Sequence, residues 1–312
     1  MPNQSNEPVK SLPAIDRRHF LSAATATAAA VGLPGPFAQA AGSSSKGRPE
    51  ICVFTKFVQS LSYDDMAAAI AEIGLDGVEA TVRKKGHVLP ERVEEDLPKH
   101  QEAIKKHGLK TTMITTDVLG IDQPNTERVL RTAASLGIKM YRMGFYRYDP
   151  KRDVREQLAE IRPRLKDLAA LNRELGMSAV YQNHSGASFV GAPLWDIYQL
   201  LQGIPVKEIG SAFDIRHATI EGNLAWPLHY DLLKPHIGAV FAKDFRWGEK
   251  KPQHVPLGTG KVDKKFFKMH MASGIDCPIS LHVEYLGKGT AQENLDAIRR
   301  DFGVLKKWLG VA

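Results

Sequence analysis

The sequence is poor in cysteine, since Cys52 and Cys277 are the only two among 312 residues. Two cysteines exclude a disulfide scaffold and a zinc site with four cysteine ligands. Long apolar runs are also missing, because no stretch beyond residue 40 approaches the roughly 18 consecutive apolar residues that span a bilayer. The composition, 43% hydrophobic and 25% charged, is typical of a globular chain with a sizeable core.

The excess of basic residues does not have the pattern of a nucleic-acid binder. Forty-two Lys and Arg against 35 Asp and Glu give a net charge of +7. The basic residues lie in helical stretches with acids between them, as in residues 147–166, and no basic run alternates with aromatic residues. We interpret the charge as a solvated surface and expect no nucleic-acid partner.

The first 40 residues have the pattern of an export signal. Residues 16–21 read Asp-Arg-Arg-His-Phe-Leu, a weakly apolar run covers residues 21–33, and Ala38-Gln39-Ala40 places small residues where a signal peptidase reads them. The segment resembles a twin-arginine signal, and its apolar run is too short and mild for a stable membrane anchor. We predict a signal peptide at residues 1–40, a linker at residues 41–49 and a periplasmic mature protein.

From residue 50 onward, short apolar runs alternate with longer segments of helical period. The predicted strands are 51–54, 77–81, 110–115, 140–143, 178–182, 210–213, 239–242 and 279–283. The predicted helices are 63–73, 97–107, 126–136, 154–175, 193–201, 227–233, 264–272 and 294–309. Several helices end in Gly and an apolar residue, as in Ile73-Gly74-Leu75, where Gly takes the left-handed cap. No Gly-x-Gly-x-x-Gly follows the first strand, which excludes a dinucleotide-binding fold. The alternation predicts the α/β class, with a single (β/α)8 TIM barrel at residues 50–312.

Polar side chains follow nearly every predicted strand. In a parallel barrel the carboxyl ends of the strands meet at one face, and active sites lie there. Since residues two apart share a face of a strand, Gln182 lies on the same face as His184, and His282 on the same face as Glu284. Seven such strand ends predict a polar pocket at this end of the barrel.

Four segments resemble the family of xylose-isomerase-like barrels, which includes sugar isomerases, sugar epimerases, inosose dehydratases and abasic-site endonucleases. They are Phe213-Asp214-Ile215-Arg216-His217-Ala218, Lys243-Asp244-Phe245, the loop at residues 256–263 and Glu284. The resemblance covers about residues 50–310 and implies the barrel fold, a small carbohydrate substrate and, as in many members, a homodimer. An endonuclease is not expected, because the chain lacks the ligands for a cluster of zinc ions.

The metal site that this resemblance implies is only half matched. Asp214 and Glu284 stand where the family has an Asp and a Glu, but Gln182 replaces a Glu and Phe241 replaces a His. A Gln carbonyl oxygen can bind a hard cation, whereas Phe cannot ligate. A divalent ion (Mn²⁺, Mg²⁺ or Zn²⁺) is therefore left open, with Gln182, Asp214 and Glu284 as its candidate ligands.

The candidate catalytic residues are Lys243, Glu284, Asp214 and Glu79. Lys243 beside two carboxylates could polarise a carbonyl, or it could form a structural ion pair across neighbouring strands. Trp247 could stack on a sugar ring. The candidate substrate-binding residues are Arg142, His184, Asn183, His217, Arg216 and Trp247.

The chemistry that the resemblance implies is proton abstraction next to the carbonyl of a sugar or polyol-derived ketone, through an enediolate. This reaction needs a carboxylate base, an acid and a cation, which is either a metal or Lys243. We predict a sugar isomerase or epimerase, which favours a metal. A lyase, dehydratase or hydratase on a keto-sugar or keto-inositol could act with Lys243 instead. The third hypothesis is a non-catalytic barrel that binds a sugar.

Cys52 and Cys277 belong to the first and last predicted strands or their edges, and these strands are neighbours in a closed barrel. A disulfide between them is left open, because it requires Cα atoms roughly 4.4 to 6.8 Å apart.

Overall fold

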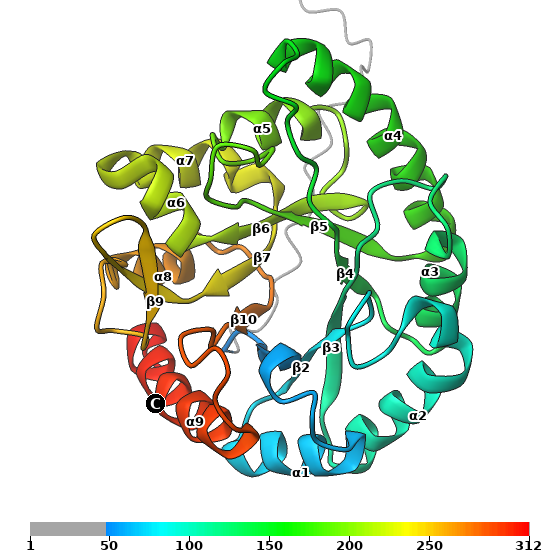
Figure 1. Ribbon diagram of the computed structural model, residues 1–312, viewed down its shortest axis with the longest axis vertical. Coiled ribbons are helices and arrows are strands. Elements are labelled where there is room, and N and C mark those ends of the chain that lie inside the picture. Colours follow the sequence, from blue (N-terminus) through cyan, green and yellow to red (C-terminus); the bar gives the residue numbers. More distant parts are fainter. Residues whose placement is uncertain (1–47, 312) are drawn as a thin grey trace, which may run out of the picture. The chain divides into compact units, whose positions relative to one another are not determined.

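The computed structural model describes residues 48–311. The predicted signal peptide and most of the predicted linker lie outside the described residues. Within the described part, eight parallel strands form one closed barrel in the order β1-β10-β7-β6-β5-β4-β3-β2, and helices surround it (Figure 1). The predicted TIM barrel is thus confirmed.

The elements agree closely with the alternation of apolar runs and helical segments in the sequence. The barrel strands are β1 (Ile51–Phe54), β2 (Gly77–Thr81), β3 (Lys110–Thr115), β4 (Met140–Arg142), β5 (Ser178–Gln182), β6 (Ile209–Asp214), β7 (Ile237–Ala242) and β10 (Ile279–Leu281). The helices are α1 (Tyr63–Ile73), α2 (Val93–Lys106), α3 (Thr126–Ser135), α4 (Val154–Leu175), α5 (Trp195–Leu201), α6 (Ile215–Gly222), α7 (Trp226–Leu233), α8 (Lys265–Ala272) and α9 (Ala291–Leu309). Helix α9 begins with a capping box in which Thr290 and Glu293 satisfy each other's backbone N–H groups. None of the helices in the described part is long and apolar enough to cross a membrane.

An apolar cluster fills the barrel interior below the strand ends. It consists of Cys52, Met113, Val180, Ala212, Ala239 and Phe241, all completely buried. Since side chains two apart on a strand share a face, Val180, Ala212 and Phe241 lie directly below the inward-facing residues at the ends of β5, β6 and β7. The polar groups above this cluster therefore have little access to water from below. Cys52 and Cys277 are both buried free thiols in the described structure, without a disulfide.

Two short elements depart from the sequence-based prediction. Residues 215–217 were expected to belong to the polar end of the sixth strand, but they form the first turn of helix α6. Residues 244–255 contain an antiparallel hairpin of β8 (Asp244–Trp247) and β9 (Pro252–Val255). Both elements are too short for a helical or alternating period to be recognised, and tertiary contacts stabilise them instead.

Asp244 anchors the hairpin and the loop that follows it. Its buried carboxylate accepts hydrogen bonds from the backbone N–H groups of Phe245, Gly258, Gly260 and Val262 at 2.8 to 3.0 Å. A Cβ atom at Gly260 would lie 2.2 Å from the carbonyl oxygen of Phe245, so only glycine fits there. The loop at residues 256–263 is therefore a structural clamp that holds the hairpin at the rim of the barrel.

Candidate active site

Two cavities open at the carboxyl ends of the strands, and they share His184, Lys243 and Glu284. The wide cavity, about 510 Å³, is lined by His184, Ser185, Gly186, Arg216, His217, Ile220, Glu221, Lys243, Trp247, Lys251, Pro252, His254 and Glu284. The narrow cavity, about 130 Å³, is lined by Phe54, Lys56, Arg83, Arg142, Phe145, Gln182, His184, Lys243, His282 and Glu284. The pocket thus lies at the face of the barrel that was predicted from the polar residues at the strand ends.

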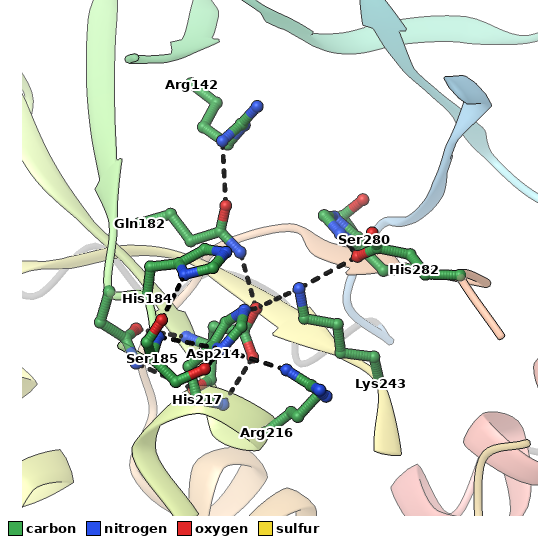
Figure 2. A network of polar contacts seen from close by, with 12 residues as sticks. Arg142, Gln182, His184, Ser185, Asp214, Arg216, His217, Lys243, Ser280 and His282 are labelled. Atoms are coloured by element: carbon green, nitrogen blue, oxygen red, sulfur yellow. Dashed lines mark hydrogen bonds and ion pairs between the residues drawn. The ribbon is translucent and has the colours of Figure 1, made fainter. Parts of the chain in front are cut away.

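Lys243 lies between two carboxylates at the centre of this site. Its Nζ is 2.9 Å from Asp214 Oδ2 (Figure 2). The same atom is 3.1 Å from Glu284 Oε1, and the lysine side chain is only 5% exposed. The three residues come from the ends of β6, β7 and β10, which are neighbours in the barrel. The fold therefore brings three of the four candidate catalytic residues into direct contact.

Asp214 is fully buried, and its carboxylate is satisfied by protein groups. Oδ2 accepts a hydrogen bond from Gln182 Nε2 at 2.7 Å, and Oδ1 accepts one from the backbone N–H of His217 at 3.1 Å, which caps helix α6. Asn183 bonds both the N–H and the carbonyl of Asp214 through its side-chain amide. Asp214 and Asn183 line neither cavity, and they position Lys243 and the start of α6.

Glu79 lies below the cavities and lines neither of them. Its carboxylate accepts hydrogen bonds from Ser280 Oγ, Thr115 Oγ1 and His282 Nε2, and Arg142 Nε lies 3.6 Å away. Burial opposes ionisation of this carboxyl, but the charges of His282 and Arg142 outweigh it and lower the pKa of Glu79 to about 2. The arrangement is that of a buried structural ion network.

His282 is enclosed between two aromatic rings. Its ring stacks on Phe54 at 4.7 Å and packs against Phe241 at 4.4 Å between centroids. Burial would lower the pKa of His282, but Glu79 and Glu284 raise it above its ordinary value. His282 therefore adds positive charge to the floor of the narrow cavity.

Glu284 is the carboxylate that reaches both cavities. Its side chain is 17% exposed, against complete burial for Asp214 and Glu79. Burial opposes its ionisation, but Lys243 and His282 hold the pKa of Glu284 well below its ordinary value. An ionised carboxylate therefore faces any molecule bound in the pocket.

Two stacked histidines have opposite tautomers. His184 Nδ1 lies 2.9 Å from the carbonyl oxygen of Ser185, so this nitrogen carries the proton and Nε2 is an acceptor. His217 Nδ1 accepts the backbone N–H of Ser185 at 3.1 Å, so its proton is on Nε2, which is buried 3.7 Å from Asp214 Oδ2 and forms no hydrogen bond among the described residues. The rings lie 4.0 Å apart. Burial lowers the pKa of both, that of His184 to about 4, so both are neutral.

The remaining candidates for substrate binding are divided between the two cavities. Arg216, in the first turn of α6, and the half-exposed Trp247, on β8, line the wide cavity. Arg142 lines the narrow cavity and donates from Nη1 to Gln182 Oε1 at 3.0 Å.

Sequence reasoning missed several residues of the cavity walls. Those with titratable or charged side chains are Lys56, Arg83, Glu221, Lys251 and His254. Arg83 could have been recognised from the sequence as a pocket residue, because it lies two residues after the end of the second strand. His254 and Lys251 could not, because the hairpin that carries them was not predicted.

The residues at this site do not fit a divalent metal. Gln182 turns its amide nitrogen to Asp214 and its carbonyl oxygen to Arg142, so that oxygen is already an acceptor for a cation. Phe241 occupies the place of a histidine ligand, and the ammonium of Lys243 lies between the two remaining carboxylates. Within residues 48–311, no group of three or more His, Cys, Asp or Glu side chains is arranged to hold a metal ion.

A closed (β/α)8 barrel with an ionic pocket at the carboxyl ends of its strands defines the general class of TIM-barrel proteins. Residues 67–308 match the family described as Xylose isomerase-like TIM barrel, and the chain belongs to that family. A comparison with curated proteins finds no significant sequence match.

Solved structures share the fold at low sequence identity. The probable 3-DHS dehydratase AsbF of Bacillus anthracis has a TM-score of 0.64 at 15% identity, covering 82% of this chain and 98% of its own. The 3-keto-D-glucoside 4-epimerase YcjR of E. coli has a TM-score of 0.63 at 16% identity, covering 83% and 100%. A xylose isomerase-like barrel of Mycobacterium smegmatis, solved with magnesium, has a TM-score of 0.58 at 14% identity, covering 84% and 98%. The structural neighbours thus include an epimerase and a dehydratase.

Proposed function

We propose that the protein is an enzyme that abstracts a proton from the carbon next to the ketone of a keto-sugar, with Lys243 stabilising the enolate oxygen. The observation that carries the proposal is the ammonium of Lys243 held between Asp214 and Glu284 in the cavity wall. A fixed positive charge in a site shielded from water stabilises a developing oxyanion strongly. Glu284, ionised and facing both cavities, is the general base.

The single ammonium of Lys243 favours epimerisation over isomerisation. It donates a hydrogen bond to Glu284 at 3.1 Å and lies 2.9 Å from Asp214, so one fixed cation is present beside the base to stabilise a substrate oxygen. Epimerisation next to a ketone keeps the carbonyl at one carbon and needs one oxygen stabilised. Aldose–ketose isomerisation moves the carbonyl to the adjacent carbon, so two oxygens must be stabilised in turn. The epimerase neighbour named for a 3-keto-D-glucoside supports this choice.

Elimination of water is the second candidate reaction. It begins with the same enolate and also needs a hydrogen-bond donor for the leaving hydroxyl. Arg216 and Lys251 line the wide cavity and carry such donors. The dehydratase among the structural neighbours supports this alternative.

Hydrogen exchange in heavy water tests the proposal directly. We expect the enzyme to incorporate deuterium into 3-keto-D-glucose at C2 or C4, the carbons next to the ketone, as followed by NMR and mass spectrometry. A C4 or C2 epimer identifies an epimerase, and a product lighter by one water identifies a dehydratase. Glu284→Gln should slow exchange by about 10²- to 10⁴-fold. Binding without exchange in any keto-sugar would identify a sugar-binding barrel and contradict the proposal.

Removal of divalent metals is expected to leave the activity unchanged. The reason is that Lys243 supplies the positive charge and that Gln182 and Phe241 replace two ligands of the family's metal site. Exchange rates are to be compared before and after dialysis against EDTA, with elemental analysis of the same samples. A rate that falls with EDTA and returns with Mn²⁺ would contradict the role of Lys243.

A further inference from the structure

We propose that the narrow cavity is a subsite for an anionic group carried by the substrate, a carboxylate or a phosphate. The inference rests on the proposed function, because it concerns which keto-sugar the same pocket accepts. It is based on the distribution of charge around the cavity and on two cations that have no partner among residues 48–311.

The lining of the narrow cavity is strongly basic. Lys56, Arg83, Arg142 and Lys243 face it, whereas Glu284 is the single carboxylate in its wall. Asp214 and Glu79 lie behind the wall and neutralise part of this charge through Lys243, Arg142 and His282. When Asp214, Glu79 and Glu284 are counted against Lys243, Arg142 and His282, the charges of Lys56 and Arg83 remain as an excess among the described residues.

The side chains of Lys56 and Arg83 form no ion pair and no hydrogen bond among residues 48–311. This distinguishes Arg83 from the other arginines of the described part, each of which has such a partner, whereas many lysines have none. The ammonium of Lys56 lies 4.7 Å from the centroid of the Phe57 ring, and the guanidinium of Arg83 lies 5.6 Å from that of Phe54. Surface arginines such as Arg48 and Arg131, by comparison, hold carboxylates at 2.6 Å.

The two free cations lie close enough to repel each other and their neighbours. Burial and the nearby charges of Arg83, Lys243 and Arg142 lower the pKa of Lys56, against the attraction of Glu284. Like charges gathered in one concave site cost free energy unless an anion relieves them. A guanidinium can bind a carboxylate or phosphate through two parallel hydrogen bonds, which makes Arg83 the main anchor.

The position of the narrow cavity suits a substituent next to the reacting centre. It shares Lys243, Glu284 and His184 with the wide cavity, so an anionic group bound inside places the attached sugar ring beside the ammonium and the base. At about 130 Å³ it has room for a substituent, whereas the wide cavity at about 510 Å³ has room for a ring.

Calorimetric titration of the full chain with D-glucuronate, D-glucose 6-phosphate and D-glucose tests the subsite. We expect at least one anionic sugar to bind about tenfold or more tightly than D-glucose, and the better one identifies the group as carboxylate or phosphate. Arg83→Gln and Lys56→Gln should each remove most of this preference. Lys84→Gln is the matched control, since it removes the same charge from an exposed neighbour outside the cavity. Equal binding of the three sugars, or a preference that survives Arg83→Gln, would overturn the proposal.

The exchange assay separates a failure of this inference from a failure of the proposed function. Exchange in neutral 3-keto-D-glucose, together with no preference for anionic sugars, contradicts the subsite and leaves the reaction supported. An anionic preference that depends on Arg83, together with no exchange in any keto-sugar, supports the subsite and contradicts the reaction.

Discussion

Replacing Lys243 with methionine is expected to lower the rate of deuterium exchange into a keto-sugar by about 10²- to 10³-fold, the scale for losing one oxyanion donor. Methionine keeps the length and apolar stem of lysine but removes the charge between Asp214 and Glu284. The enolate oxygen then has no cation beside it. The rate is to be measured per folded molecule, with the folded fraction determined by circular dichroism.

Stability must be measured alongside, because Lys243→Met leaves two buried carboxylates without their cation. Lys250→Met is the matched control: it makes the same change on an exposed residue of the hairpin region. A folded Lys243→Met protein with the parent rate would show that the ion pair is structural. The same rate loss in Lys250→Met would show that the effect is unspecific.

Glu79→Gln is expected to lower the free energy of unfolding by about 3.5 kcal/mol at neutral pH, although Glu79 does not touch the cavities. The pKa of Glu79 falls from an ordinary 4.5 to about 2 in the folded protein, and each unit corresponds to about 1.4 kcal/mol. Glutamine keeps the size but removes the charge that holds His282 and Arg142. The measurement is urea unfolding at pH 7, with the exposed Glu91→Gln as control.

The pH dependence of stability provides an independent check on Glu79. Because its folded pKa is depressed, its contribution is complete above the unfolded value of about 4.5 and is lost as the pH falls from there to about 2. The difference in stability between the parent and Glu79→Gln should therefore shrink across this interval. If Glu79→Gln has the stability of the parent but a greatly reduced turnover rate, Glu79 takes part in catalysis and its structural role is contradicted.

The sequence by itself determined the barrel and the end of it that carries the pocket. The periods of strands and helices indicate which residues face the core. Eight consecutive βα units then favour one topology, a closed parallel barrel. Polar residues such as His184, Lys243 and Glu284 directly after apolar strands then had to gather at one face. These inferences depend on local pattern and chain order, which a single sequence contains.

Only the tertiary structure decided how deep each polar residue lies and what it contacts. The sequence places Glu79 and Glu284 alike near the polar ends of strands, yet Glu79 lies in the middle of β2, buried beneath His282, whereas Glu284 follows β10 and faces the cavities. Lys56 and Arg83 meet because β1 and β2 are paired, and His254 reaches the pocket on a hairpin clamped by Asp244. Depth and lateral neighbours depend on strand register and on packing between distant segments. A side-chain period of two along one strand carries no information about either.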